Sequence, residues 1–100
     1  MKYEITLSAE EDFIEIWNYT ANNWGKAQAR SYLEIIEKSF NDIASENYVY
    51  RSLYHKDLMI NYLHCGKHCI FFLDKKPPII TAILHEKMDF ISALNKRLPV

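Results

Sequence analysis

The stretch SAEEDFIEIWNYTANNWGKAQARSYLEIIEKSFNDI, residues 8–43, contains two apolar stripes in succession. Each stripe recurs at steps of three and four residues, the spacing that places side chains on one face of an α-helix. The first stripe consists of Ala9, Phe13, Ile16, Trp17 and Thr20, and the second of Ala29, Tyr32, Leu33, Ile36, Phe40 and Ile43. Asn22, Asn23 and Gly25 interrupt the pattern, because Asn and Gly tolerate the positive φ of a tight connection. The stretch therefore predicts a helical hairpin whose two stripes need a further apolar surface.

Polar residues mark the start of the first helix. Ser8 and Glu11 have the spacing of a capping box, which predicts that the helix begins at Ser8. Further acidic side chains follow within residues 10–15, among them Asp12. We expect this acidic cluster to be a solvated first turn, where the helix dipole stabilises negative charge.

The remaining apolar surface is predicted to come from strands. Residues 2–7 alternate apolar and polar side chains, 49–53 is a weak strand candidate, and 58–63, 69–73 and 79–84 are stronger ones. The connections between the last three are short, which makes these strands antiparallel neighbours. Residues 90–98 favour a final helical turn or two. The sequence thus predicts an α+β fold with an N-terminal strand, a helical hairpin and a three-stranded antiparallel sheet segment.

Composition indicates one globular domain over residues 1–100. Apolar residues make up 49% of the chain and charged residues 25%, unlike the charge-rich composition of disordered proteins. The longest apolar run, residues 69–73, is far shorter than the roughly 20 residues that cross a bilayer. The N-terminal residues also lack the apolar core of a secretory leader. We therefore expect no membrane association and a cytoplasmic location, where the two Cys stay reduced.

Charge is distributed unevenly along the chain. Residues 1–50 contain four basic and nine acidic side chains, whereas residues 51–100 contain eight basic and four acidic ones and all four His. If the two halves occupy different faces, the C-terminal side favours an acidic partner. The other interpretation is a solvated surface of uneven charge.

Several common kinds of site are excluded by the sequence. The two Gly residues are isolated, so no glycine-rich phosphate loop is present and we expect no nucleotide cofactor. His64, Cys65, His68 and Cys69 are close in sequence, but their spacing matches none of the usual zinc patterns. We therefore interpret Cys69 as a core residue and Cys65 as a neighbour of a turn, and we predict no metal site.

A set of polar residues in the second half could form one largely basic surface. The candidates for binding a target are Arg51, Lys67, His68, His85, Lys87 and Asp89. Such a surface suits an acidic protein, or an RNA phosphate held by Arg51 or Lys67 while His68 or His85 transfers a proton. The alternative is that these are solvated side chains at strand ends.

The order of several short motifs resembles a known family. The motifs are WNYTANNWG at 17–25, Ala29 and Tyr32 in the second helix, HCIFF at 68–72 and ILHEKMD at 83–89. Together they resemble the ParE-type toxins of the RelE/ParE superfamily, which belong to bacterial type II toxin-antitoxin systems. The resemblance extends over nearly the whole chain.

This resemblance implies a function and its partners. It implies a helical hairpin packed on an antiparallel sheet, a cognate antitoxin whose disordered tail folds over the toxin, and DNA gyrase as a target that is inhibited by binding. It implies no cofactor and no catalytic residues, and we do not expect direct binding to nucleic acid. RelE-type relatives instead cut messenger RNA on the ribosome. That alternative stays open, as does a non-toxic binding module of the same fold.

The resemblance also extends to individual positions. Trp24 and Gly25 match the family's interhelical turn, Tyr32 its aromatic residue in the second helix, His85, Met88 and Asp89 its closing motif, and Arg51 an Arg at the start of the second strand. The departures are the missing Pro and Gly before Arg51, Leu73 in place of a polar residue, and the unmatched end FISALNKRLPV. For the antitoxin we predict a helix along the groove beside the hairpin and an extended segment at a sheet edge. The predicted contacts are Phe13, Trp17, Trp24, Tyr32 and Ile36.

Overall fold

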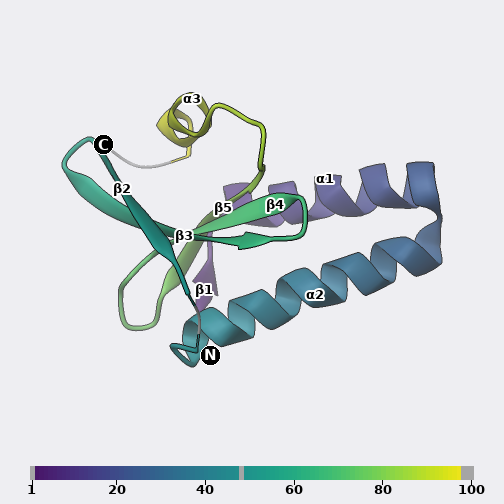
Figure 1. Cartoon of the computed structure of the whole chain (residues 1–100), viewed down its shortest axis with the longest axis horizontal. Coiled ribbons are helices and arrows are strands. Elements are labelled where there is room, and N and C mark those ends of the chain that lie inside the picture. The colour runs from purple at the N-terminus through teal and green to yellow at the C-terminus, as the bar shows by residue number, and fades with distance from the viewer. Residues whose placement is uncertain (1, 48, 98–100) are drawn as a thin grey trace.

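The computed structural model describes residues 2–47 and 49–97, which form three helices and five strands (Figure 1). In chain order the elements are β1 (Glu4–Ile5), α1 (Leu7–Trp24), α2 (Lys26–Ala44), β2 (Arg51–His55), β3 (Leu58–Cys65), β4 (His68–Leu73), β5 (Ile79–His85) and α3 (Phe90–Asn95). This confirms the predicted α+β class. Among the described residues, no helix combines the length and the hydrophobicity needed to cross a membrane.

The described strands form one mixed sheet in the order β1-β5-β4-β3-β2. Strands β2 to β5 are antiparallel neighbours, so the weak candidate at 49–53 corresponds to a fourth antiparallel strand at 51–55. β1 is parallel to β5 and pairs through Glu4 with Ile79 and Ile5 with Ile80. The sheet is therefore larger than predicted, because the N-terminal strand joins the C-terminal one, and pairing between such distant residues leaves no local pattern in the sequence.

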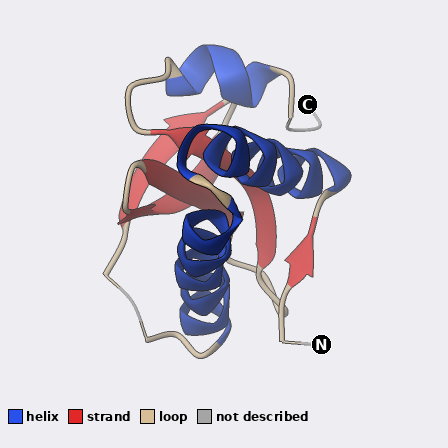
Figure 2. Cartoon of the chain, turned by 90° about the vertical axis from the view of Figure 1, so that its right-hand side faces the viewer, coloured by secondary structure: helices blue, strands red, loops and turns tan. Residues whose placement is uncertain are grey.

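Helices α1 and α2 cover one face of the sheet, and Figure 2 shows them in front of the strands. The buried side chains of α2 are Ala29, Leu33, Ile36, Phe40 and Ile43, which are the predicted stripe without Tyr32. All of them except Ala29 belong to the same core cluster as Ile70 and Phe72 of β4. The helical hairpin is therefore anchored on the centre of the sheet, as its stripes require.

Helix α3 covers part of the opposite face. Its Phe90 packs edge-on against Phe71 of β4, with ring centroids 4.9 Å apart, and its Leu94 is fully buried. The predicted helical turn at 90–98 is confirmed for residues 90–95, while Leu98 lies outside the described residues. The sheet thus has an apolar core on each side.

A β-bulge allows β5 to serve both cores. Phe71 pairs with Ala82 and Phe72 with Ile80, which leaves Thr81 as the extra residue of the bulge. The buried hydroxyl of Thr81 donates a hydrogen bond to the Phe71 carbonyl at 3.2 Å. Because of the extra residue, Ile80 and Ile83 contribute to the same core cluster, although positions three apart in a regular strand lie on opposite faces.

Helix α1 begins before the predicted capping box at Ser8. Thr6 is the N-cap, and its hydroxyl oxygen accepts a hydrogen bond from the Ala9 amide at 3.2 Å. Thr6 is held against β5, because its amide donates to the Ile80 carbonyl at 3.0 Å and its hydroxyl to the Thr81 carbonyl at 3.3 Å. The contact with a distant strand thus fixes the start of the helix, and Ser8 lies inside it.

A single residue, Gly25, links α1 to α2. Its φ of 94° and ψ of 160° lie in a region that only glycine adopts readily. α1 continues through Asn22 and Asn23 to Trp24, so these two Asn residues are helical and do not form the predicted connection. The hairpin is tighter than expected because one glycine supplies the whole change of direction.

Asp12 is buried, which corrects the prediction of a solvated position for this residue. Its side chain is 7% exposed and its Oδ1 lies 2.6 Å from Nη2 of Arg97. Its Oδ2 accepts a hydrogen bond from the Ile83 amide at 3.0 Å. β1 pairs with β5 only at Ile79 and Ile80, so it does not reach the Ile83 amide further along β5. The Asp12 carboxylate accepts the hydrogen bond of that amide instead. One side chain thereby joins α1, β5 and the segment after α3.

Replacing Asp12 with Ala is expected to destabilise the fold by about 3 kcal/mol, because it leaves both a backbone amide and the Arg97 guanidinium without their buried partner. Urea unfolding followed by circular dichroism measures this loss. The control is Glu11→Ala, one residue earlier on an exposed position of the same helix, which should change the stability by less than about 0.5 kcal/mol. Equal stability of the two variants would contradict this role of Asp12.

Candidate functional site

A cleft of about 820 Å³ lies between α1, α2 and the end of the sheet. Figure 1 shows that both helices extend past this end of the sheet. Its walls are the two helices, the turn between β3 and β4, and the segment after β5. The polar side chains that line it include Asp12, Glu15, Tyr32, Lys67, His68, His85, Glu86, Lys87 and Arg97. Four exposed apolar side chains also line it, and we call these the apolar rim: Tyr19, Trp24, Ile35 and Met88. We call the whole feature the hairpin cleft.

Tyr32 fixes the floor of the hairpin cleft by contacting the turn between β3 and β4. Its hydroxyl oxygen accepts a hydrogen bond from the Lys67 amide at 3.0 Å and lies 2.6 Å from Nδ1 of His68. A Cβ atom at Gly66 would lie 2.7 Å from Cε1 of Tyr32, and Gly66 has a φ of 62°, so both the contact and the backbone favour glycine there. Burial raises the pKa of the Tyr32 phenol, which keeps the hydroxyl protonated.

His68 and His85 lie side by side on this floor. They face each other across the β4–β5 pair, with ring centroids 5.5 Å apart. Burial lowers the pKa of His68, and the neighbouring His85 lowers it further. His68 is therefore a neutral imidazole at physiological pH. Nδ1 of His85 accepts a hydrogen bond from the Lys87 amide at 3.2 Å.

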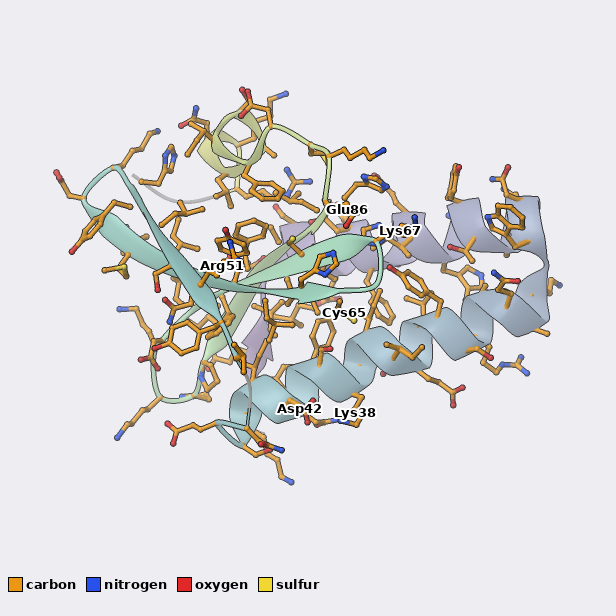
Figure 3. The ribbon with its side chains drawn as sticks, viewed as in Figure 1. Lys38, Asp42, Arg51, Cys65, Lys67 and Glu86 are labelled. Atoms are coloured by element: carbon orange, nitrogen blue, oxygen red, sulfur yellow. The ribbon has the colours of Figure 1, made fainter. Side chains whose placement is uncertain are left out.

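Glu86 is held at the edge of the hairpin cleft by two hydrogen bonds. Its amide donates to the Lys67 carbonyl at 2.9 Å, and its Oε1 lies 2.7 Å from Nε2 of His64. The hydrogen bond from His64 lowers the pKa of the Glu86 carboxyl. Figure 3 shows Lys67 and Glu86 close together beside the β3–β4 turn. The two groups place opposite charges at this end of the cleft.

The structure brings four of the six predicted target-binding residues together and leaves two elsewhere. Lys67, His68, His85 and Lys87 all line the hairpin cleft. Arg51 lies at the start of β2, where it pairs with Tyr62, and Figure 3 shows it far from Lys67 and Glu86. Asp89 is the N-cap of α3, and hydrogen bonds from Ser92 lower the pKa of its carboxyl. The six residues therefore do not form the single surface that the sequence suggested.

The predicted antitoxin contacts are divided among three environments. Trp24 and Tyr32 line the hairpin cleft. Phe13 and Trp17 line a second hollow of about 310 Å³ on the hairpin, together with Ile14, Arg30 and Leu33, and we call it the outer hollow. Ile36 is fully buried in the core and has no surface to offer a partner. The position of Ile36 on the apolar stripe of α2 already indicated that its side chain is buried. A partner can contact only apolar side chains that are exposed.

Three residues of the apolar rim were not among the predicted site residues. Tyr19, Ile35 and Met88 are all exposed and line the cleft. Tyr19 and Ile35 lie outside the two helical stripes, and an apolar residue off the stripe is the signal that could have identified them. Arg97 was missed because its contact with Asp12 spans almost the whole chain.

The two Cys residues belong to different cores. Cys65 is in the cluster under the helices and Cys69 in the cluster under α3, and both thiols are free. They therefore cannot combine with the nearby His residues into one site. Within residues 2–47 and 49–97, no group of three or more His, Cys, Asp or Glu side chains is placed to hold a metal ion.

Comparison with known proteins adds sequence and structural relatives. Residues 3–90 match the family model described as "ParE toxin of type II toxin-antitoxin system, parDE". The chain is 32% identical over 98 residues to "Toxin ParE" of Escherichia coli, which covers 96% of this chain and 95% of that protein. It is 26% identical over 89 residues to "Toxin ParE1" of Caulobacter vibrioides, covering 87% and 91% of the two chains.

A solved structure described as "Chromosomal ParDE TA system from P. aeruginosa" has a similar fold. The TM-score is 0.72 at 17% sequence identity, and the match covers 85% of this chain and 95% of that one. The similarity supports the arrangement of a helical hairpin on a sheet.

The lowered pKa of His68 predicts a pH dependence of stability. The folded-state pKa lies below the ordinary value of 6.5, so the unfolded chain takes up a proton first as the pH falls. The unfolding free energy is therefore fully retained above that value and decreases as the pH drops through it. Urea unfolding at about pH 7.5 and about pH 5.5 should show this decrease, and His68→Gln should reduce it. An NMR titration that gives His68 a pKa above 6.5 would refute the prediction.

Proposed function

The chain belongs to the ParE toxin family of type II toxin-antitoxin systems, and from this membership we propose that a cognate antitoxin neutralises it and that it inhibits DNA gyrase in the cytoplasm. The inhibition is by binding and involves no catalytic step by the toxin. The observation that carries the proposal is the hairpin cleft, which combines an apolar rim with the target-binding candidates of the strand ends. Such a surface suits contact with another protein.

The antitoxin segment occupies the hairpin cleft in this proposal. The support is the exposure of its rim, since Trp24 is 65% and Ile35 54% exposed. Large apolar side chains in this number at one concave site indicate a protein partner. The cleft volume of about 820 Å³ accommodates several side chains of an amphipathic helix. An extended segment of the same antitoxin adds to β2, one of the two edge strands of the sheet.

Neutralisation follows from overlap of the two binding sites. Lys67, His68, His85 and Lys87 line the same cleft as the apolar rim. An antitoxin segment seated there covers these four side chains and keeps them from a target. Arg51 lies outside the cleft, so it contributes to target binding only as a separate contact.

The target is tested with the purified chain and DNA gyrase. We expect the chain to block supercoiling of relaxed plasmid and the cognate antitoxin to restore it. Lys87→Glu should weaken the inhibition about tenfold, because it replaces a charge-assisted contact with repulsion. Lys75→Glu is the matched control, since Lys75 is an exposed lysine in the connection between β4 and β5 and does not line the cleft.

Labelled precursors distinguish the target in cells. On induction of the chain, thymidine incorporation should fall before leucine incorporation. Early loss of leucine incorporation with cut messenger RNA would instead support a ribosome-dependent ribonuclease, and unimpaired growth would support a non-toxic binding module. Either of these results excludes gyrase as the target.

The antitoxin site is tested with two matched substitutions on the helices. Ile35→Asp in the hairpin cleft should weaken antitoxin binding about a hundredfold, because it places an unpaired charge where apolar surface is buried. Ile14→Asp changes an isoleucine of nearly equal exposure, 57% against 54%, in the outer hollow and should leave the affinity unchanged. Isothermal titration calorimetry measures both, and circular dichroism confirms folding. The reverse pattern would place the antitoxin in the outer hollow.

A further inference from the structure

The contacts of Nδ1 favour one tautomer of His68. Nδ1 lies 2.6 Å from the Tyr32 hydroxyl, whose oxygen already accepts the amide proton of Lys67. The hydroxyl can donate its own proton to the Cys65 carbonyl at 3.4 Å or to Nδ1, and the shorter distance favours Nδ1. A ring nitrogen that accepts a hydrogen bond has no proton of its own, so the proton of the neutral imidazole is on Nε2. The lowered pKa of His68 agrees with a neutral ring.

His85 is held in the same tautomer by a different donor. Its Nδ1 accepts the amide proton of Lys87 at 3.2 Å. A backbone amide can only donate, so the direction of this hydrogen bond is fixed and the imidazole proton is again on Nε2.

The two rings lie together in the lining of the hairpin cleft, each with an Nε2–H group to donate. His68 and His85 occupy paired positions of β4 and β5, with ring centroids 5.5 Å apart and ring planes at 78°. Both line the hairpin cleft, and no hydrogen bond within the described part of the chain uses Nε2 of either ring. Because Tyr32 and the Lys87 amide fix the rings beforehand, a ligand that accepts both hydrogen bonds does not have to order them.

We propose that the Nε2–H groups of His68 and His85 form an anion-binding subsite in the hairpin cleft, whose ligand is a carboxylate side chain of the protein segment that fills the cleft. Lys67 and Lys87 also line the cleft and add positive charge. Hydrogen bonds from a donor to an ionised carboxylate are among the stronger ones in proteins. The proposal rests on the proposed function, because the segment in question is that of the antitoxin.

The remaining groups of the cleft favour a carboxylate on a protein over a nucleic acid. Glu15 and Glu86 line the same cleft, and the hydrogen bond from His64 keeps Glu86 ionised. A phosphate backbone has a charge at every nucleotide and would be repelled by both carboxylates. A single Asp or Glu between apolar residues instead reaches the imidazoles while its neighbours contact the apolar rim. The antitoxin segment should therefore carry one acidic side chain within an apolar stripe.

The subsite is first tested on the full chain without any partner. Long-range ¹H–¹⁵N NMR of the imidazoles should show a proton on Nε2 of both His68 and His85. Addition of sodium acetate, with sodium chloride at equal ionic strength as the control, should shift the Nε2 signals of these two rings in a saturable way. A proton on Nδ1 of either ring, or no specific effect of acetate, overturns the proposal.

Two substitutions at His85 then test the role of Nε2 in antitoxin binding. A Gln side chain places its amide near the position of Nε2, whereas an Asn side chain places it near Nδ1. His85→Asn should weaken antitoxin binding about tenfold, and His85→Gln should retain most of the affinity. His85 is exposed, so neither change is expected to unfold the chain. Equal affinity of both variants and the unaltered chain overturns the proposal.

Failure of the inference can be distinguished from failure of the proposed function. If the unaltered chain binds no antitoxin, the proposed function fails, while the acetate experiment still decides whether the subsite exists. A short single-stranded RNA provides the opposing arm. Specific displacement of the His68 and His85 signals by this RNA and not by acetate would assign the subsite to a nucleic acid and overturn the assignment to a protein carboxylate.

Discussion

Strands β4 and β5 carry apolar side chains on both faces of the sheet, and this constraint organises the rest of the molecule. In β4, Ile70 and Phe72 belong to one core cluster, and Cys69 and Phe71 to the other. A sheet of this kind must be covered on both sides to keep its side chains from water. The helical hairpin covers one side and α3 packs against the other, while the bulge at Thr81 keeps β5 in phase with both cores.

The hairpin cleft arises because the two helices of the hairpin extend beyond the sheet that they cover. α1 has 18 residues and α2 has 19, and their Gly25 ends extend past the turn between β3 and β4 (Figure 1). Beyond the sheet, the facing sides of the helices have no strand to cover them. Side chains such as Trp24 therefore remain exposed at a concave site. The same architecture that buries the core thus leaves an apolar surface available to a partner.

The elements were largely predictable because each has a local pattern. The stripe of α2 and the apolar run of β4 are complete within one segment, and periodicity identifies them. The candidate site was predictable only in part. His68 begins β4, His85 ends β5 and Lys87 follows it, and functional side chains often lie at such strand ends. All three do line the cleft. Ile36 was predicted as an antitoxin contact but is fully buried, because an apolar residue on a helical stripe packs into the core.

The sequence by itself determined the fold class, the helical hairpin and three of the four strands that follow it, because alternation and helical periodicity are properties of neighbouring residues. Only the tertiary structure decided that Asp12 is buried, that Arg97 pairs with it, and that β1 joins β5. These contacts connect the first and last parts of the chain, and the free energy that holds them depends on burial and on partners that no local pattern records. The tautomers that we infer for the two cleft imidazoles have the same origin, since they follow from contacts with a phenol of α2 and a backbone amide after β5.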